Sequence, residues 1–310
     1  MSKEYSGTTY IIVTWNNENE IEDCLSTVYR FSSQSSNVIV VDNASKDRTV
    51  QIVKEKFPDV ELIESKENLG FAAANNLALE NVSSQYVCYL NPDVILTEDI
   101  LTPSIEILEN QIEIGLVACR LKNRDGSNQP SCFNFANSWS LPCEILHIGA
   151  LMPKSLKRKY FLNYYRANDD FDPDWVIGAE MVMRTKDAQA IGGFSTEYFM
   201  YAEDMDLCKK ISVNLKKKIY FISDVSLIHL GGASEAQNIS YRKQRKLLEN
   251  DLAFVKKFYG ENESKKMKKR AMNAYLLRKL LLTVAYWKKD RRKQLSKTEE
   301  AYNILKRVEG

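Results

Sequence analysis

Carboxylates occur at three places where a predicted strand ends or the loop after it begins. They are Asp42 with Asp47, then Asp93, then the group Glu203, Asp204 and Asp206. Crowded carboxylates repel one another, so a cation or hydrogen-bond donors must lie among them. A divalent cation bridging to a diphosphate would meet that need. A single strand-end aspartate also commonly caps a turn, so a structural role stays open for each.

His229 is one of two histidines in the chain, and it directly follows the apolar segment Val225–Ile228. An imidazole together with a carboxylate suits Mn²⁺ or Mg²⁺, with substrate oxygens completing the coordination. The alternative is a histidine that only supports the fold.

Asp42 ends a predicted strand and opens the sequence Asp42-Asn43-Ala44-Ser45. A carboxylate there can accept a hydrogen bond from N3–H of uracil or thymine, which cytosine lacks. The same residues also suit an Asx-turn. The sequence leaves both interpretations open.

The elements that must position these residues alternate between strand and helix. Predicted strands cover Thr9–Thr14, Val38–Val41, Val60–Ile63 and Tyr86–Leu90, and Pro92 ends the last of them. Helical patterns lie between them, and Ser45 is expected to cap the helix that carries Val50, Val53 and Phe57. This alternation predicts an α/β fold, with a parallel sheet covered by helices on both faces. Ligands gather at the carboxyl ends of the strands in such a sheet.

The pattern breaks after the predicted strand Gly115–Cys119. Residues 123–174 are polar, aromatic and irregular, which is typical of a binding region. Their aromatic residues include Trp139, Tyr160, Phe161, Tyr164 and Tyr165. Order returns at Trp175–Ala179, at a helix beginning near Glu203, and at short strands over Ile219–Ile222 and Val225–Ile228.

Charge is divided unevenly along the 310 residues. Residues 1–241 carry 22 lysines and arginines against 33 acids, and residues 242–310 carry 21 against 8. A basic segment after an acidic body predicts an anionic partner for that segment, either membrane lipid or nucleic acid. The segment is predicted to be helical, with an apolar stripe and then interleaved cations and apolar residues. The stripe is Leu247, Leu248, Leu252, Val255 and Phe258, and the later residues are Tyr275, Leu276, Leu277, Leu280, Leu281, Leu282, Val284, Tyr286 and Trp287.

Three interpretations of the basic helices remain open: a solvated face, an interfacial helix on an anionic membrane, and a dimer interface. Nucleic acid is disfavoured, because the body is acidic and carries no nucleic-acid motif. The six cysteines are scattered, which predicts free buried thiols in a reducing compartment. We find no signal-peptide pattern, and no apolar run approaches the ~20 residues of a membrane span.

Five motifs in order resemble the family 2 glycosyltransferases, which have the GT-A fold, and especially the bacterial rhamnosyltransferase-like branch. They are Val41–Asp47, Glu67–Asn76, Leu90–Asp93, Gly192–Phe194 and Glu203–Cys208. The resemblance covers residues 8–235. It implies a Rossmann-like, mostly parallel sheet in residues 1–238. The basic segment 239–310 belongs to none of these motifs, and its composition predicts a helical C-terminal extension for membrane association or dimerisation.

The resemblance also implies roles for individual residues. Thr14, Trp15, Asn16 and Asp42 would hold the nucleobase, and Asn68, Gly70, Phe71, Asn75 and Asn91 would line the donor site. Asp93 and His229 would bind the metal, Mn²⁺ or Mg²⁺. Trp175, Gly178 and Asp206 would face the sugar and acceptor. Asp204 would be the general base, and Glu203 and Asp206 are close enough in the sequence to be confused with it; Glu203 is counted with Asp204 as a candidate catalytic residue.

Two positions depart from the common family pattern. Asn91 stands where many members have aspartate, so the metal would have one firm carboxylate, Asp93, and depend more on His229 and substrate phosphates. Lys209 and Lys210 stand where many members have an arginine, and lysine lacks the bidentate fork.

The resulting hypothesis is an inverting, metal-dependent enzyme that moves L-rhamnose from dTDP-rhamnose to a lipid-linked glycan in cell-surface polysaccharide synthesis. It would lie in the cytoplasm, peripherally on the inner face of the cell membrane, and could form a homodimer. The alternatives are a UDP-galactose, UDP-glucose or UDP-N-acetylglucosamine donor, or an inactive nucleotide-binding or membrane-scaffold protein. The sequence leaves the acceptor, the linkage and the oligomeric state open.

Overall fold

A computed structural model of the chain describes residues 7–32, 36–151, 153, 169–198, 200–231, 240–284 and 290–308. The chain forms two compact units. The first unit is Met1–Cys132 with Tyr165–Gln237, and the second unit is Phe133–Tyr164 with Asn238–Gly310. The predicted aromatic residues Tyr160, Phe161, Tyr164, Tyr165, Tyr286 and Trp287 lie outside the described residues.

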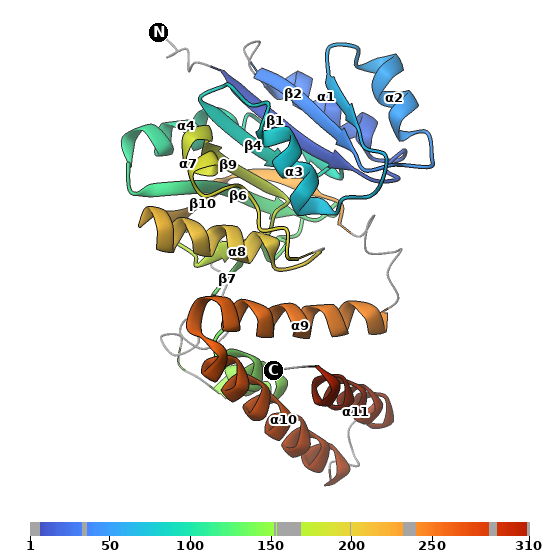
Figure 1. The fold of residues 1–310 in the computed structure, drawn as a ribbon, viewed down its shortest axis with the longest axis vertical. Helices are drawn as coiled ribbons and strands as arrows, with labels where there is room; N and C mark the ends of the chain where they lie inside the picture. The colour runs from blue at the N-terminus through green and yellow to red at the C-terminus, as the bar shows by residue number, and fades with distance from the viewer. Residues whose placement is uncertain are drawn as a thin grey trace. The chain divides into compact units, whose positions relative to one another are not determined.

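An eight-stranded sheet in the order β3-β2-β1-β4-β9-β6-β10-β5 forms the centre of the first unit (Figure 1). Its strands are β1 (Thr8–Thr14), β2 (Ser36–Asp42), β3 (Glu61–Glu64), β4 (Tyr86–Leu90), β5 (Val94–Leu96), β6 (Ile114–Lys122), β9 (Glu180–Arg184) and β10 (Lys218–His229). β3, β2, β1 and β4 are parallel to one another, and β6 is parallel to β10. β9 runs antiparallel between β4 and β6, and β5 runs antiparallel to β10. The predicted α/β fold with a mostly parallel sheet is confirmed.

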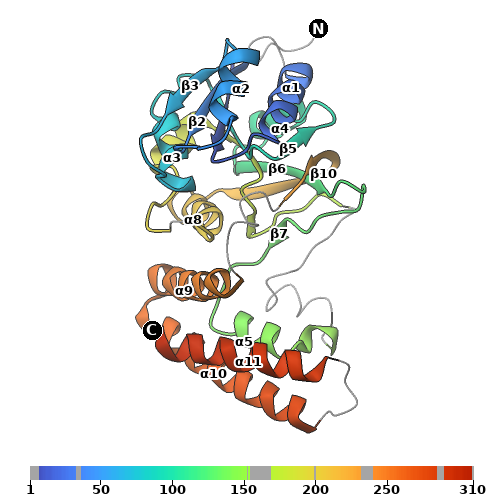
Figure 2. The same ribbon diagram turned by 90° about the vertical axis from the view of Figure 1, so that its right-hand side faces the viewer.

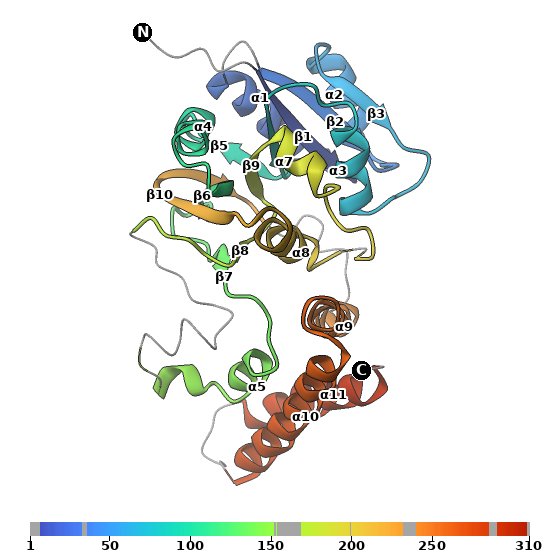
Figure 3. The ribbon, with the colours of Figure 1, turned by 60° about the vertical axis from the view of Figure 1, so that its left-hand side comes forward.

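Helices cover both faces of this sheet. They are α1 (Ile21–Phe31), α2 (Thr49–Lys56), α3 (Phe71–Leu79), α4 (Leu101–Asn110), α7 (Thr185–Ala190) and α8 (Glu203–Lys210), which continues into the π-helical η2 (Ile211–Leu215). α1, α2 and α4 share one apolar core with side chains such as Tyr10, Val40 and Cys88. α3 and α7 lie on the opposite side (Figure 3). Because both faces are buried, β1, β2 and β4 are nearly continuous apolar runs.

Two local predictions are wrong. α2 begins at Thr49, so Ser45 does not cap it; the Ser45 hydroxyl accepts the Asn16 amide instead (2.9 Å). Asp47 stabilises the start of α2, since its Oδ1 accepts the amide and the hydroxyl of Thr49 (3.0 and 2.6 Å). The two short strands predicted near residues 219–228 are one strand, β10, with a register irregularity between Ile222 and Ser226.

The second unit is helical. It contains α5 (Ser140–Ile145), the short 3₁₀ turn η1 (Ile148–Leu151), α9 (Ser240–Tyr259), α10 (Glu261–Val284) and α11 (Arg291–Arg307). α10 packs against α5, α9 and α11 (Figure 2). The prediction of an irregular insert is therefore wrong over α5. In α9, Leu248, Leu252 and Val255 are buried as the apolar stripe predicts, whereas Leu247 is exposed.

The short strands β7 (Cys132–Phe133) and β8 (Trp175–Val176) lie outside the large sheet. All six cysteines are free and buried, as predicted. In the part of the chain that the structure describes, no helix combines the length and the apolar character that crossing a membrane requires.

Candidate active site

Strand directions bring the predicted site segments to one edge of the sheet. The parallel strands β2, β1 and β4 end at this edge with Asp42, Thr14 and Leu90. Antiparallel β9 begins there, and the Asn91 amide donates to the Ala179 carbonyl (2.9 Å). Because β6 and β10 are oriented like β4, the carboxyl end of β10 lies at the same edge.

Asp42 lies deep in this edge, with 3% of its surface exposed. Its Oδ1 accepts the Thr14 hydroxyl (3.2 Å), and its Oδ2 accepts the Ser45 amide (3.0 Å). The local turn interpretation therefore describes its present contacts, and recognition of a nucleobase stays a prediction. Trp15 and Asn16 lie half-buried in the adjoining loop. The Asn16 side chain accepts the Lys46 amide (2.7 Å), which joins the two loops.

The segment that begins with Asn68 is held by amide side chains. Asn68 Oδ1 accepts the Gly70 amide (2.9 Å), and Asn43 bonds both the Leu69 amide and the Gly70 carbonyl (3.2 Å each). Asn75 is buried, and its Nδ2 donates to the Phe71 carbonyl (2.9 Å). Asn68, Gly70 and Asn75 thus set the backbone of the predicted donor segment.

Asn76 explains the Gly-Gly-Phe motif, which lies about 118 residues away in the sequence. Its side chain bonds both the amide and the carbonyl of Phe194 (2.8 Å each). Gly193 has φ +59°, and a Cβ there would lie 2.2 Å from Asn76 Oδ1, so the turn requires glycine. Phe194 then packs edge-on against Phe71 and Tyr89 (5.4 and 4.9 Å between ring centroids).

Phe71, Gly178 and Asp204 meet at one point. A Cβ on Gly178 would lie 3.5 Å from Phe71 Cζ and 3.7 Å from Asp204 Cβ. The Gly178 amide donates to Asp204 Oδ2 (3.2 Å), and the Met205 amide donates to Oδ1 (2.8 Å). The predicted donor side, acceptor side and general base are therefore in contact.

Glu203 and Asp204 have environments suited to different protonation states. Burial raises the pKa of Asp204, and the two amides that it accepts oppose the rise. Burial and the neighbouring Asp204 charge both raise the pKa of Glu203. The charge of Asp204 adds to the rise at Glu203, whereas the Gly178 and Met205 amides favour the ionised form of Asp204, so Glu203 is the better place for a proton within the pair.

The backbone before this pair is strained. Tyr201 and Ala202 have φ +72° and +81°, in the left-handed region. Each such residue costs about 1–3 kcal/mol, and such strain clusters at functional sites.

Asp206 is fully buried and accepts the Ser195 hydroxyl (2.5 Å), so it points away from Asp204 and holds the turn after Phe194. Trp175 is half-buried at the start of β8. The nearby Ile177 amide donates to the Ser131 carbonyl (3.0 Å).

Asp93 and His229 face each other across two paired strands. His229 pairs with Val94 in the β10–β5 ladder, and the Leu230 amide donates to the Asp93 carbonyl (2.9 Å). Asp93 Oδ1 lies 3.4 Å from His229 Nε2, and both side chains are nearly buried. His229 Nδ1 bonds Gln129 Oε1 (2.7 Å), so a neutral ring directs its Nε2 lone pair at the carboxylate.

Two acceptors facing each other require a cation or a proton between them, and a nitrogen–oxygen pair suits Mn²⁺ or Mg²⁺. The residues therefore fit a divalent cation. Among the described residues, no third histidine, cysteine or carboxylate joins them. Asn91 is half-buried beside Asp93, which leaves one carboxylate, as the sequence indicates.

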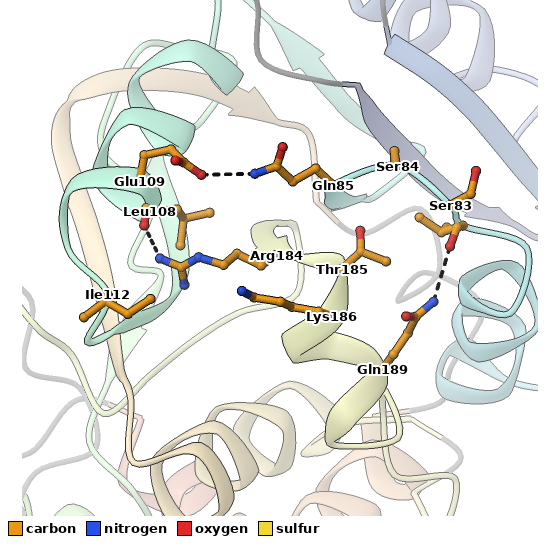
Figure 4. A pocket seen from close by; sticks show the side chains of 11 residues that line it. Ser83, Ser84, Gln85, Leu108, Glu109, Ile112, Arg184, Thr185, Lys186 and Gln189 are labelled. Carbon is orange, nitrogen blue, oxygen red and sulfur yellow. Dashed lines mark hydrogen bonds between the residues drawn. The ribbon is translucent and has the colours of Figure 1, made fainter.

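A separate cavity of about 530 Å³ lies at the opposite edge of the sheet (Figure 4). Ser84 and Gln85 precede β4, and Arg184 ends antiparallel β9, so this is the amino edge of the parallel strands. Arg184 donates to the carbonyls of Leu108 and Ile114, and Gln85 donates to Glu109 (3.2 Å). Arg184 thus joins the end of β9 to the last turn of α4, and Gln85 joins the residues before β4 to the same helix. None of the predicted site residues lines this cavity.

Comparison with known proteins identifies the family. Residues 9–160 match the family model described as Glycosyl transferase family 2. The chain carries a family 2 glycosyltransferase domain. The predictions of the family and of a glycosyltransferase enzyme are confirmed.

Two curated relatives of this glycosyltransferase are rhamnosyltransferases. N-acetylglucosaminyl-diphospho-decaprenol L-rhamnosyltransferase of Mycobacterium tuberculosis is 23% identical over 210 residues, which cover 64% of this chain and 67% of that protein. Rhamnosyltransferase WbbL of Escherichia coli is 26% identical over 233 residues, which cover 71% of this chain and 81% of that protein.

Among solved structures, the mannosyltransferase PcManGT from Pyrobaculum calidifontis in complex with GDP-Man and Mn²⁺ is similar, with a TM-score of 0.61. It is 18% identical, and the match covers 97% of this chain and 86% of that chain. At this identity the similarity supports the fold alone, and the fold is GT-A.

Sequence reasoning missed Gln129, which contacts His229 from the stretch expected to be irregular. No motif marks this glutamine, and its role depends on a contact across 100 residues.

Proposed function

We propose that this glycosyltransferase is inverting and metal-dependent, and that it moves L-rhamnose from dTDP-rhamnose to a lipid-linked glycan acceptor in cell-surface polysaccharide synthesis. The observation that carries the proposal is the pair of Asp93 and His229 at the sheet edge that also presents Asp204. Both curated relatives described above are rhamnosyltransferases, and the name of one gives a diphospho-decaprenol acceptor.

The chemistry assigns a task to each group. A divalent cation held by Asp93 and His229 would neutralise the negative charge that grows on the leaving nucleoside diphosphate. The acceptor hydroxyl attacks the sugar from the opposite face, which inverts the anomeric configuration. Asp204 takes the hydroxyl proton, since its Oδ2 is oriented by the Gly178 amide and Glu203 already holds a proton.

The base and the sugar of the donor could instead be those of a UDP-hexose. Thymine and uracil present the same N3–H to Asp42, so UDP-galactose, UDP-glucose and UDP-N-acetylglucosamine remain candidates. The family 2 glycosyltransferase domain argues against the inactive nucleotide-binding or scaffold protein.

A nucleotide-sugar panel, with and without Mn²⁺ or Mg²⁺, tests the donor. A ligand that binds only the folded protein raises its melting temperature. We expect dTDP-rhamnose with metal to raise it most, and that mixture to release dTDP on incubation. If a UDP-hexose raises the melting temperature and dTDP-rhamnose does not, that UDP-hexose would replace dTDP-rhamnose as the proposed donor.

For the second unit we infer an anionic membrane surface as the partner. Leu276, Leu277, Leu280, Leu281 and Val284 are 45–62% exposed, and their spacing places them on one face of α10. Lysines precede them on the same helix. The exposed Trp139 lies beside α10, with the Arg270 guanidinium 4.0 Å from its ring centroid.

Cations beside exposed aliphatic and aromatic residues suit an interfacial helix on anionic lipid. The protein would then act peripherally on the cytoplasmic face of the cell membrane, where a lipid-linked acceptor is available. A homodimer through the same face is the competing proposal.

A further inference from the structure

A chain of polar contacts leads from a surface turn to the ring of His229. Ser127 Oγ donates to Asp125 Oδ1 (2.6 Å), and Asn123 Nδ2 donates to Ser127 Oγ (2.9 Å). Gln129 Nε2 donates to Asn123 Oδ1 (3.2 Å), and Gln129 Oε1 meets His229 Nδ1 (2.7 Å). These four contacts are called the relay below.

The direction of each hydrogen bond in the relay is determined by the one before it. The hydroxyl and amide of Ser127 hold the pKa of Asp125 below its ordinary value, so Asp125 is an ionised acceptor. Ser127 must therefore donate to Asp125 and accept from the Asn123 amide group. That orientation turns Asn123 Oδ1 toward Gln129 Nε2, which leaves Gln129 Oε1 as an acceptor for the imidazole.

The backbone that carries the relay is a tight hairpin. The Asn123 amide donates to the Ser127 carbonyl (2.8 Å), and the Gln129 amide donates to the Leu121 carbonyl (2.8 Å). Gly126 has φ +82° and closes the turn with its amide on the Asn123 carbonyl (2.9 Å). Gln129 thus lies on the returning arm of the hairpin, where Asn128 bridges antiparallel to Lys122 at the end of β6, and β6 pairs with the β10 strand that carries His229.

We propose that Gln129 is a positioning residue that holds His229 as the Nδ1–H tautomer and presents an unprotonated Nε2 toward Asp93. The inference rests on the proposed metal-dependent function, because that tautomer places a lone pair where a divalent cation would bind. A ligating imidazole that donates its other N–H to an oxygen has a defined tautomer and ring orientation. Without Gln129, water would compete for Nδ1, and the ring would be free to carry its proton on Nε2, as histidine prefers in water.

Two readouts on the full-length ¹⁵N-labelled protein test this inference. Long-range ¹H–¹⁵N spectra, recorded where the imidazoles are neutral, report the tautomer of each ring. The chain has only two histidines, so a His147→Gln variant assigns both signals. Isothermal titration calorimetry with Mn²⁺ alone reports the metal affinity.

We expect the Nδ1–H tautomer of His229 in the wild-type protein and its loss in Gln129→Leu. Mn²⁺ affinity in Gln129→Leu should fall about 10- to 100-fold. Gln129→Glu keeps an acceptor toward Nδ1 and should restore both readouts. Gln189→Leu is the matched control, because that glutamine donates to the Val82 carbonyl at the opposite edge of the sheet (3.3 Å), and it should change neither readout.

Retention of the Nδ1–H tautomer and of Mn²⁺ affinity in Gln129→Leu would overturn the inference. A changed tautomer with unchanged Mn²⁺ affinity would show that His229 is not a ligand, which overturns the metal assignment of the proposed function. If Gln129→Leu does not fold, Asn123→Ala frees the Gln129 amide to turn over. It should shift both readouts in the same direction, and unchanged readouts would again overturn the inference.

Discussion

The site edge of the first unit and the exposed face of α10 in the second unit use their polar and apolar residues in opposite ways. At the site edge, Asp42, Asn76 and Asp204 are each held by at least two hydrogen bonds, and apolar residues are buried behind them. On α10, leucines are exposed, and cations form surface pairs such as Lys279 with Glu299 (2.8 Å). Fixed polar groups suit chemistry, whereas exposed leucines suit contact with an apolar phase.

The largest expected effect comes from breaking the site edge at Asp204. Asp204→Asn keeps the shape of the side chain but removes the proton acceptor, so kcat should fall about 10²- to 10⁴-fold. Donor binding, measured by thermal shift, should be unchanged. Asp206→Asn is the contrasting variant, since it weakens the bond to Ser195 and should lower stability more than turnover. Normal transfer by Asp204→Asn would remove it as the base.

The next effect compares two leucines of α10. Leu282 is 5% exposed and Leu280 is 62% exposed. Leu282→Ala should lower the free energy of unfolding by about 2–5 kcal/mol, because it leaves a cavity. Leu280→Ala should leave it nearly unchanged in urea denaturation. Equal losses would mean that the exposed face is packed in solution.

In the first unit, the buried Glu180 makes the stability of the fold depend on pH, unlike the exposed face of α10. It is buried on β9, accepts the Cys119 amide (2.7 Å), and burial raises its pKa to about 8. Between the ordinary glutamate pKa and about 8, the folded state binds a proton that the unfolded state has lost. Stability should therefore fall as pH rises through this range.

The variant Glu180→Gln cannot lose a proton. It should be about as stable as the wild type at pH 5 and more stable at pH 8, measured by thermal denaturation at both values. Equal melting temperatures of the wild type and Glu180→Gln at pH 8 would contradict a raised pKa of the buried Glu180 carboxyl group.

The smallest effect concerns membrane contact. Leu280→Ser with Leu281→Ser should reduce sedimentation with anionic phospholipid vesicles and leave the melting temperature unchanged, since both side chains are exposed. Neutral vesicles should bind the wild type more weakly than anionic ones. Unchanged vesicle binding, together with a loss of dimer in light scattering, would favour the homodimer.

Much of the first unit was predictable because its signals are local. Apolar runs predict β1, β2 and β4, and strand-end residues such as Asp42 and Asp93 follow directly from where those runs stop. The order of five motifs predicts the family. The exposed face of α10 was not predictable in the same way, since apolar residues occur on several sides of its second half and periodicity alone does not select the buried Leu282.

The sequence by itself determined the alternation of strands and helices, the residues that stand at the strand ends, and the division into an acidic body and a basic tail. Only the tertiary structure decided that antiparallel β9 enters between β4 and β6, which brings Gly178 to Asp204. Only the pairing of β10 with β5 and β6 brings His229 to Asp93 and Gln129. The reason is physical: local patterns depend on near neighbours in the chain, whereas these contacts join segments about 26–136 residues apart, whose pairing depends on the whole sheet.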